Sequence, residues 1–183
     1  MKRMALVLAL AGTCIFNFAG ASPALALETY EARTEASDAA SQARIDMLEA
    51  FGDKMLRPGQ YVWRDVRGTA GPQRVVVSLS DQLAYLYRGD TLVAVSTISS
   101  GKDEKPTPTG IFTVLAKQQM YRSKKYDNAP MPWMQRIDQY GIALHAGFNP
   151  GAPASHGCVR LPSAFAKKLY SVTDVGTPVY IGA

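Results

Sequence analysis

Cysteine and histidine are scarce in this chain, whose 183 residues include two of each. Cys14 lies inside an apolar stretch near the N-terminus, so Cys158 is the single cysteine of the remaining chain. One cysteine excludes an intramolecular structural disulfide. Both histidines, His145 and His156, lie within 13 residues of Cys158. We therefore interpret Cys158 as a reactive thiol with an imidazole supplied nearby.

Long hydrophobic runs are also missing, except for one apolar stretch close to the N-terminus. It covers residues 5–16, follows the basic start Lys2-Arg3 and precedes the small-residue pattern Ala24-Leu25-Ala26. This order of charge, apolar run and small residues predicts a secretory signal peptide over residues 1–26. The alternative is a retained membrane anchor, which the shortness of the run disfavours.

The chain carries little excess charge. Lysine and arginine number 20 against 15 acidic residues, a net charge of +5, and Lys2 and Arg3 supply two of these charges. The remaining balance of +3 is too mild to indicate a nucleic-acid partner. About 157 residues follow residue 26, a length that suits one domain with its own core.

Residues 28–57 form the predicted helical part of the chain. Small or apolar residues recur there at steps of three and four, as one face of a helix requires. They are Ala32, Ala36, Ala39, Ala40, Ala43, Met47, Phe51 and Met55. Because this stripe is mostly alanine, we expect a lightly packed helix or a spacer; a partner-docking element and a part of the main domain are the alternatives. Proline and glycine breaks at 57–59 and 68–72 close this helical extension and linker, residues 27–72.

After residue 72 the sequence pattern is typical of β-strands. Runs rich in β-branched, leucine and tyrosine residues predict strands at 74–80, 82–88, 91–99, 110–116, 142–145 and 177–181. Pro162 and Ser163 open a predicted short helix near the C-terminus. We predict a mainly β fold, a sandwich or a closed mixed sheet, over residues 73–182.

Residues 117–140 show little periodicity and contain Pro130 and Pro132. We predict a long loop here, of the kind that forms a lid or a binding loop. Its aromatic side chains either stack on a substrate or only pack over the loop. These residues are Tyr121, Tyr126, Trp133 and Tyr140.

The segment with the most chemical content is Ser155-His156-Gly157-Cys158-Val159-Arg160. A free thiol, with a pKa of about 8.5, is mostly protonated at neutral pH. An imidazole that takes this proton gives a thiolate–imidazolium pair that can attack a carbonyl. We assign this base to His145, because the end of a buried strand would fix its ring and a backbone carbonyl such as that of Ala146 could select its tautomer. The pattern predicts a cysteine acyl-transfer site.

The residues around Cys158 suggest supporting roles. Gly157 allows a sharp turn and the close approach of a substrate carbonyl, so the amides of Gly157 and Cys158 are candidate oxyanion donors. His156 flanks the nucleophile, and we expect it to shape the turn or to donate a hydrogen bond. Ser155 would hold the turn or orient an imidazole. Arg160 is the candidate clamp for a substrate carboxylate, with an internal salt bridge as the alternative.

His145, a short glycine-containing connection and the block from Ser155 to Arg160 resemble the signature of the L,D-transpeptidase catalytic domain, the YkuD-like family. Residues 77–114 resemble the opening strands of that domain and its P-T-P-x-G-x-F element. The likeness covers residues 73–182. Two features differ from the common family pattern: only nine residues separate His145 from Ser155, and Arg160 stands where asparagine is frequent.

The resemblance implies an exported enzyme of bacterial peptidoglycan that acts in the periplasm and has an L,D-transpeptidase-like β-sandwich of mixed sheets. Cys158 would attack the carbonyl between the L-centre of meso-diaminopimelate and the terminal D-alanine of a tetrapeptide stem. D-Alanine would leave, and an amine acceptor would resolve the acyl-thioester, giving a 3-3 crosslink or an anchored envelope protein. The family also implies acylation by carbapenems and the use of neither a metal nor an organic cofactor.

Three other functions would use the same residues differently. With water as the acceptor, the same thioester chemistry makes the protein an L,D-carboxypeptidase. His145, His156 and Cys158 could instead ligate zinc in a metallohydrolase, although no acid pair lies at ligand spacing in the sequence. A non-catalytic peptidoglycan-binding module is the third alternative, but such a module has no need of an intact His145 and Cys158. The acceptor and the oligomeric state stay open at this point.

Overall fold

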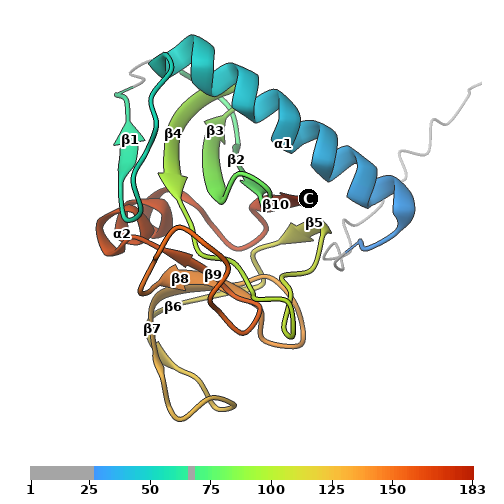
Figure 1. Ribbon diagram of the computed structural model, residues 1–183, viewed down its shortest axis with the longest axis vertical. Helices are drawn as coiled ribbons and strands as arrows, with labels where there is room; N and C mark the ends of the chain where they lie inside the picture. Colours follow the sequence, from blue (N-terminus) through green and yellow to red (C-terminus); the bar gives the residue numbers. More distant parts are fainter. Residues whose placement is uncertain (1–26, 66–68) are drawn as a thin grey trace, which may run out of the picture.

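The computed structural model describes residues 27–65 and 69–183, which form two β-sheets and two helices (Figure 1). The larger sheet, sheet A, has the strand order β1-β4-β3-β2-β10-β5, and the smaller sheet, sheet B, has the order β6-β7-β8-β9. The predicted signal peptide, residues 1–26, lies outside the described residues. Sheet A contains β1 Tyr61–Trp63, β2 Gln73–Ser78, β3 Leu83–Arg88, β4 Thr91–Thr97, β5 Gly110–Thr113 and β10 Pro178–Gly182; sheet B contains β6 Ala116–Arg122, β7 Pro130–Arg136, β8 Ala143–Ala146 and β9 Val159–Leu161; the helices are α1 Tyr30–Phe51 and α2 Ser163–Val172.

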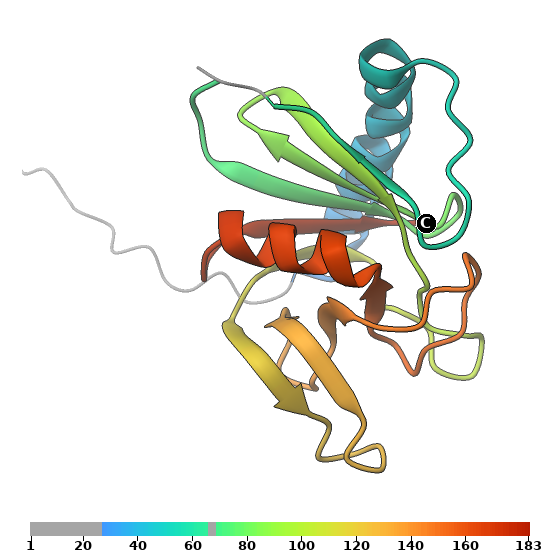
Figure 2. The same cartoon turned by 90° about the vertical axis from the view of Figure 1, so that its left-hand side faces the viewer.

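Two hydrophobic cores lie on the two faces of sheet A. Strand β2 contributes to both cores, because its side chains point alternately to the two faces of the sheet. Val75 and Val77 face the core shared with sheet B and α2, whereas Val76 faces α1. Figure 2 shows α2 lying between the two sheets. Its apolar face buries Phe165 and Leu169 in the shared core. This shared core therefore supports sheet B, on which the predicted site residues lie.

Helix α1 covers the outer face of sheet A (Figure 1). Thr29 caps its N-terminus by accepting a hydrogen bond of 3.2 Å from Ala32 N–H. Its alanine stripe faces the sheet, and a Cβ added to Gly182 would lie 2.6 Å from Ala36 O. Small residues on both sides thus permit a close approach, and the helix packs on the sheet as part of the fold. Neither helix in the described residues has the length and hydropathy needed to cross a membrane.

The predicted mainly β fold with mixed sheets is confirmed. All six predicted strands and the short C-terminal helix are present, with boundaries shifted by a few residues. Sheet A is mixed because β10 pairs with β2 in parallel, and sheet B because β8 pairs with β9 in parallel. Two short strands, β1 and β9, were not predicted from the sequence.

The prediction of a long loop over residues 117–140 is wrong. Strands β6 and β7 form an antiparallel hairpin there, and it projects from the body of the molecule (Figure 2). Pro130 and Pro132 misled the prediction, since proline interrupts most strands. Strand β7 pairs with β8 only at Gln135 and Arg136, so both prolines lie where β7 has a single neighbour, β6. A missing N–H is tolerated at such an edge.

Candidate active site

Strands β8 and β9 bring His145, Cys158 and Arg160 to one side of sheet B. In their parallel register Leu144 is opposite Val159, and His145 is opposite Arg160. Leu144 and Val159 point into the shared core. Because successive side chains of a strand alternate, His145 and Arg160 point to the opposite face, together with Cys158, which directly precedes β9.

A cavity of about 510 Å³ opens on this face. All but one of the site residues predicted from the sequence line it: His145, Ser155, His156, Cys158 and Arg160. The exception, Gly157, is buried in the loop behind them. Residues of the β6–β7 hairpin, including Met131, form the opposite wall. Residues separated along the chain thus share one concave site, as small-molecule and peptide sites usually require.

The His145 imidazole is buried, and one hydrogen bond fixes its orientation. Its side chain is only 6% exposed, and Nδ1 lies 2.8 Å from Ala146 O. A carbonyl only accepts, so Nδ1 carries the proton and Nε2 stays available as a proton acceptor. Burial lowers the pKa of His145, the Ala146 hydrogen bond raises it, and the Arg160 charge lowers it. The ring is therefore mostly uncharged at neutral pH.

Cys158 is a half-buried free thiol whose Sγ lies 3.8 Å from Gly141 O. Burial raises its pKa, a backbone hydrogen bond with Ala143 lowers it, the Asp138 charge raises it and the Arg160 charge lowers it. Burial thus disfavours the charged form of both Cys158 and His145. Both pKa shifts favour a neutral thiol beside a neutral imidazole, so a thiolate–imidazolium pair is disfavoured until the imidazole takes the thiol proton.

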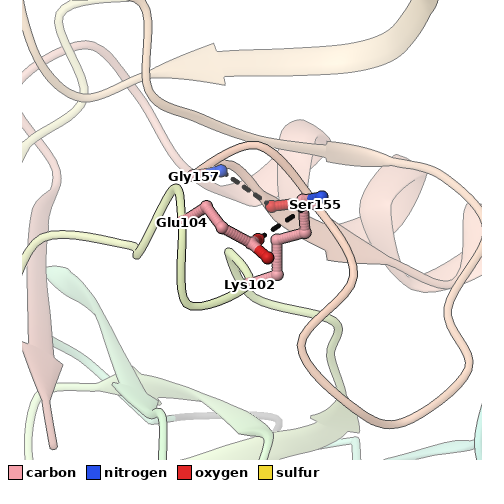
Figure 3. A network of polar contacts seen from close by, with 4 residues as sticks. All are labelled: Lys102, Glu104, Ser155 and Gly157. Atoms are coloured by element: carbon pink, nitrogen blue, oxygen red, sulfur yellow. Dashed lines mark hydrogen bonds and ion pairs between the residues drawn. The ribbon is translucent and has the colours of Figure 1, made fainter.

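Ser155 holds the turn that presents Cys158, the first of the roles expected for it. Its buried hydroxyl donates to Cys158 O at 2.5 Å. It also accepts from Gly157 N–H at 3.1 Å, a contact that Figure 3 shows. Gly157 has φ +110°, and a Cβ there would lie 2.6 Å from Ile142 Cδ1. The loop 155–158, which we call the catalytic loop, therefore requires glycine at 157 for both conformation and space.

A second hydroxyl, which the sequence reasoning missed, braces the same loop from the segment between β4 and β5. Thr107 Oγ1 accepts from Gly101 N–H and donates to Gly157 O, each at 2.8 Å. Close to this contact Lys102 N–H donates to Ser155 O at 3.2 Å. Lys102 also forms a 3.4 Å ion pair with Glu104, which solvent exposure makes weak (Figure 3). The signal for Thr107 was its place in the P-T-P-x-G-x-F element.

Asp138 is another supporting residue that no sequence signal indicated. It is 4% exposed, and its carboxylate accepts hydrogen bonds of 2.7 Å from the N–H groups of Gly141 and Ile142. These bonds hold the chain where it enters β8, directly beside the Cys158 sulfur. Asp138 therefore positions the backbone around the Cys158 sulfur.

His156 and Arg160 have different surroundings. His156 is exposed and stacks on Tyr126, with ring centroids 4.6 Å apart. The Arg160 stem packs against Gly147, where an added Cβ would lie 3.1 Å from Arg160 Cγ. Within residues 27–65 and 69–183, Arg160 has no ion-pair partner, and no group of three or more His, Cys, Asp or Glu side chains could hold a metal ion.

A family model for the L,D-transpeptidase catalytic domain, YkuD, matches residues 72–181. This chain belongs to the YkuD family of L,D-transpeptidase catalytic domains. Membership of this cell-wall enzyme family implies a location outside the cytoplasm. The match includes the whole catalytic loop together with His145 and Thr107.

Two relatives of this YkuD-family chain are similar to it in sequence. A Bacillus licheniformis protein named YkuD, a candidate L,D-transpeptidase, is 33% identical over 118 residues, covering 60% of this chain and 66% of the relative. L,D-transpeptidase 3 of Mycobacterium tuberculosis is 32% identical over 108 residues, covering 48% of this chain and 38% of the relative. The chain thus spans less than two thirds of the length of either relative.

Solved structures of L,D-transpeptidases have the same fold. One from Mycobacterium smegmatis superposes with a TM-score of 0.57 at 21% identity, covering 72% of this chain and 70% of that chain. L,D-transpeptidase 3 from Mycobacterium tuberculosis, in complex with a faropenem-derived adduct, superposes with a TM-score of 0.56 at 22% identity, covering 61% and 60%. At these identities the likeness establishes the L,D-transpeptidase-like architecture.

Proposed function

We propose that this YkuD-family protein is a cysteine-dependent L,D-transpeptidase that acts on peptidoglycan stem peptides in the periplasm. The observation that carries the proposal is the pairing of β8 with β9. It puts the His145 imidazole and the Cys158 thiol on one face of sheet B, where both line the same cavity. The Ala146 carbonyl holds Nδ1, which leaves Nε2 as the proton acceptor.

In the acylation step Cys158 Sγ attacks the carbonyl carbon before the terminal D-alanine of a tetrapeptide stem. The thiol proton passes to His145 Nε2 as the C–S bond forms. His145 then returns this proton to the departing nitrogen, the C–N bond breaks and D-alanine leaves as an amine. The neutral resting pair suits this sequence, because no charge has to be buried until the substrate is bound.

The catalytic loop and Arg160 would assist this step. The Gly157 N–H is already bonded to Ser155 Oγ, so we assign stabilisation of the oxyanion to the backbone amide of Cys158 itself. Arg160, which lines the cavity without an ion-pair partner among the described residues, is suited to a stem carboxylate. Its positive charge would also stabilise the thiolate as it forms.

Transfer to an amine requires that a second substrate, the acceptor, reaches the acyl-thioester on Cys158. A second cavity, of about 390 Å³, also reaches Cys158 and is lined by Glu104, Lys105 and Tyr140, among others. Cys158 thus lies where two cavities meet, which a two-substrate reaction needs and a simple hydrolase does not. This arrangement favours an amine acceptor, in a 3-3 crosslink or an anchored envelope protein, over water.

Intact-protein mass spectrometry with a tetrapeptide stem tests the proposal. We expect an adduct equal to the stem without D-alanine, mapped to Cys158, together with one equivalent of free D-alanine. Cys158→Ala should form no adduct, and His145→Ala should slow acylation by about 100-fold or more, since a general base contributes this much. Release of D-alanine by Cys158→Ala, or an adduct on another residue, would contradict the mechanism. Liquid chromatography then separates crosslinked dimer from the free tripeptide that a carboxypeptidase makes.

A further inference from the structure

The stacked rings of Tyr126 and His156 connect the β6–β7 hairpin to the catalytic loop, which also contains Cys158. Five residues line both cavities: Ser123, Tyr126, Met131, His156 and Cys158. Two of them are in direct ring contact, since the Tyr126 and His156 rings lie 4.6 Å apart and are inclined by only 17°. Tyr126 comes from the hairpin tip and His156 from the catalytic loop. This one contact therefore joins both segments at the boundary between the cavities.

The backbone of the hairpin tip is arranged to hold Tyr126 in this position. Ser123 Oγ accepts hydrogen bonds from Tyr126 N–H at 3.0 Å and from Lys125 N–H at 3.3 Å. Ala129 N–H donates to Tyr126 O at 2.8 Å. Residues 124, 125 and 127–130 around it are exposed, whereas Tyr126 is half-buried. The tip is thus ordered around a side chain that stacks on the catalytic loop.

The base of the hairpin is anchored separately. Trp133 in β7 has φ +56°, a conformation that is unfavourable for a bulky side chain. Its ring packs on Tyr170 of α2, with centroids 5.6 Å apart, and this contact compensates for the strain. Because the base is fixed on α2, loss of the contact at the tip would free the tip without unfolding the hairpin.

We propose that Tyr126 is a specificity-determining residue whose stacking on His156 keeps the two cavities separate while the thioester exists. The inference rests on the proposed function. In aminolysis the acceptor nitrogen bonds to the thioester carbon, the C–S bond breaks, and the amine proton passes through His145 to the Cys158 sulfur. In hydrolysis a water oxygen takes the place of that nitrogen, and the donor is lost as a free acid. The stack keeps water in the donor cavity from reaching the acceptor side of the thioester and so favours the amine.

The test is the partition of the thioester between amine and water, with a tetrapeptide stem as both donor and acceptor. The dimer-to-tripeptide ratio and the rate of D-alanine release are measured by liquid chromatography and mass spectrometry. We expect Tyr126→Ala to lower the ratio about two- to tenfold, the range that corresponds to losing one ring stack, and to lower it by a larger factor than it lowers the rate of D-alanine release. Tyr126→Phe keeps the ring and should retain the wild-type ratio. Tyr30→Ala, at an 81% exposed tyrosine of α1, is the matched control.

Three results would overturn the inference. An unchanged ratio in Tyr126→Ala means that the stack does not govern partition. A Tyr126→Phe enzyme that behaves like Tyr126→Ala assigns the effect to the hydroxyl instead of the ring. A parallel fall of ratio and D-alanine release marks a merely structural role. In each case D-alanine release still reports on the proposed function, whereas a wild-type protein that releases none refutes that function and this inference together.

Discussion

Thr107→Val is the most direct test of how the fold holds the catalytic loop. The Thr107 side chain is 5% exposed, and its hydroxyl bridges Gly101 N–H and Gly157 O with two bonds of 2.8 Å. Valine keeps the branched shape but can neither accept from one group nor donate to the other. Water cannot easily replace the hydroxyl in so buried a place, so both backbone groups lose a partner.

The magnitude follows from the burial of the two groups. A buried polar group without a partner costs about 1–3 kcal/mol. The hydrogen bond to Gly157 O is buried, so the cost of losing it takes this full range. Gly101 N–H is partly exposed, so the loss of its hydrogen bond costs less. We expect the free energy of unfolding to fall by about 2–4 kcal/mol and the Tm by about 5–15 °C. A domain of ordinary stability, about 5–15 kcal/mol, remains folded.

The same substitution should slow acylation, because Cys158, the proposed nucleophile, directly follows Gly157 in the chain. A displacement of about 1 Å can cost about 100-fold in rate, so we expect Cys158 acylation by a stem peptide to slow by about 10- to 100-fold. Thermal unfolding by circular dichroism and acylation by mass spectrometry measure the two effects. Thr107→Ser keeps the hydroxyl and is the matched control. Equal stability and equal acylation in the valine and serine variants would refute the reasoning.

Further predictions concern the charge, the packing and the chemistry of the site. Arg160→Ala removes a cation that lowers the pKa of His145, so this pKa should rise. Since protonated His145 cannot act as a base, the acid side of the acylation pH profile should move to higher pH, whereas Arg160→Lys should leave it in place; identical profiles would contradict this. Ala36→Leu should cost about 1–3 kcal/mol in urea unfolding, because Ala36 is fully buried between α1 and sheet A. Glu35→Leu, on the exposed side of α1, should cost about 0.5 kcal/mol or less, and similar losses at both positions would argue against the packing. Chelators should leave acylation of Cys158 unchanged; inactivation by chelators, with about one zinc ion bound per chain, would instead support the zinc alternative.

Local patterns in the sequence were sufficient for most of the fold. Alternating apolar residues and turn residues identified the strands, and the alanine stripe identified α1. The hairpin over residues 116–136 was missed because Pro130 and Pro132 are acceptable only if one side of β7 is unpaired. Whether a strand has one neighbour or two is a property of the whole sheet, so no local rule could supply it.

The sequence by itself determined the candidate chemistry of this protein: one thiol beyond the N-terminal apolar stretch, two imidazoles near it and a motif that places a glycine before Cys158. Only the tertiary structure decided how that chemistry is held and controlled. Thr107 lies 50 residues from its partner Gly157, and Tyr126 lies 30 residues from His156. Contacts between such distant residues depend on which strands pair and in what register. Residue type indicates what a side chain can do, but its pKa, its partners and its access to water follow from what the fold packs around it.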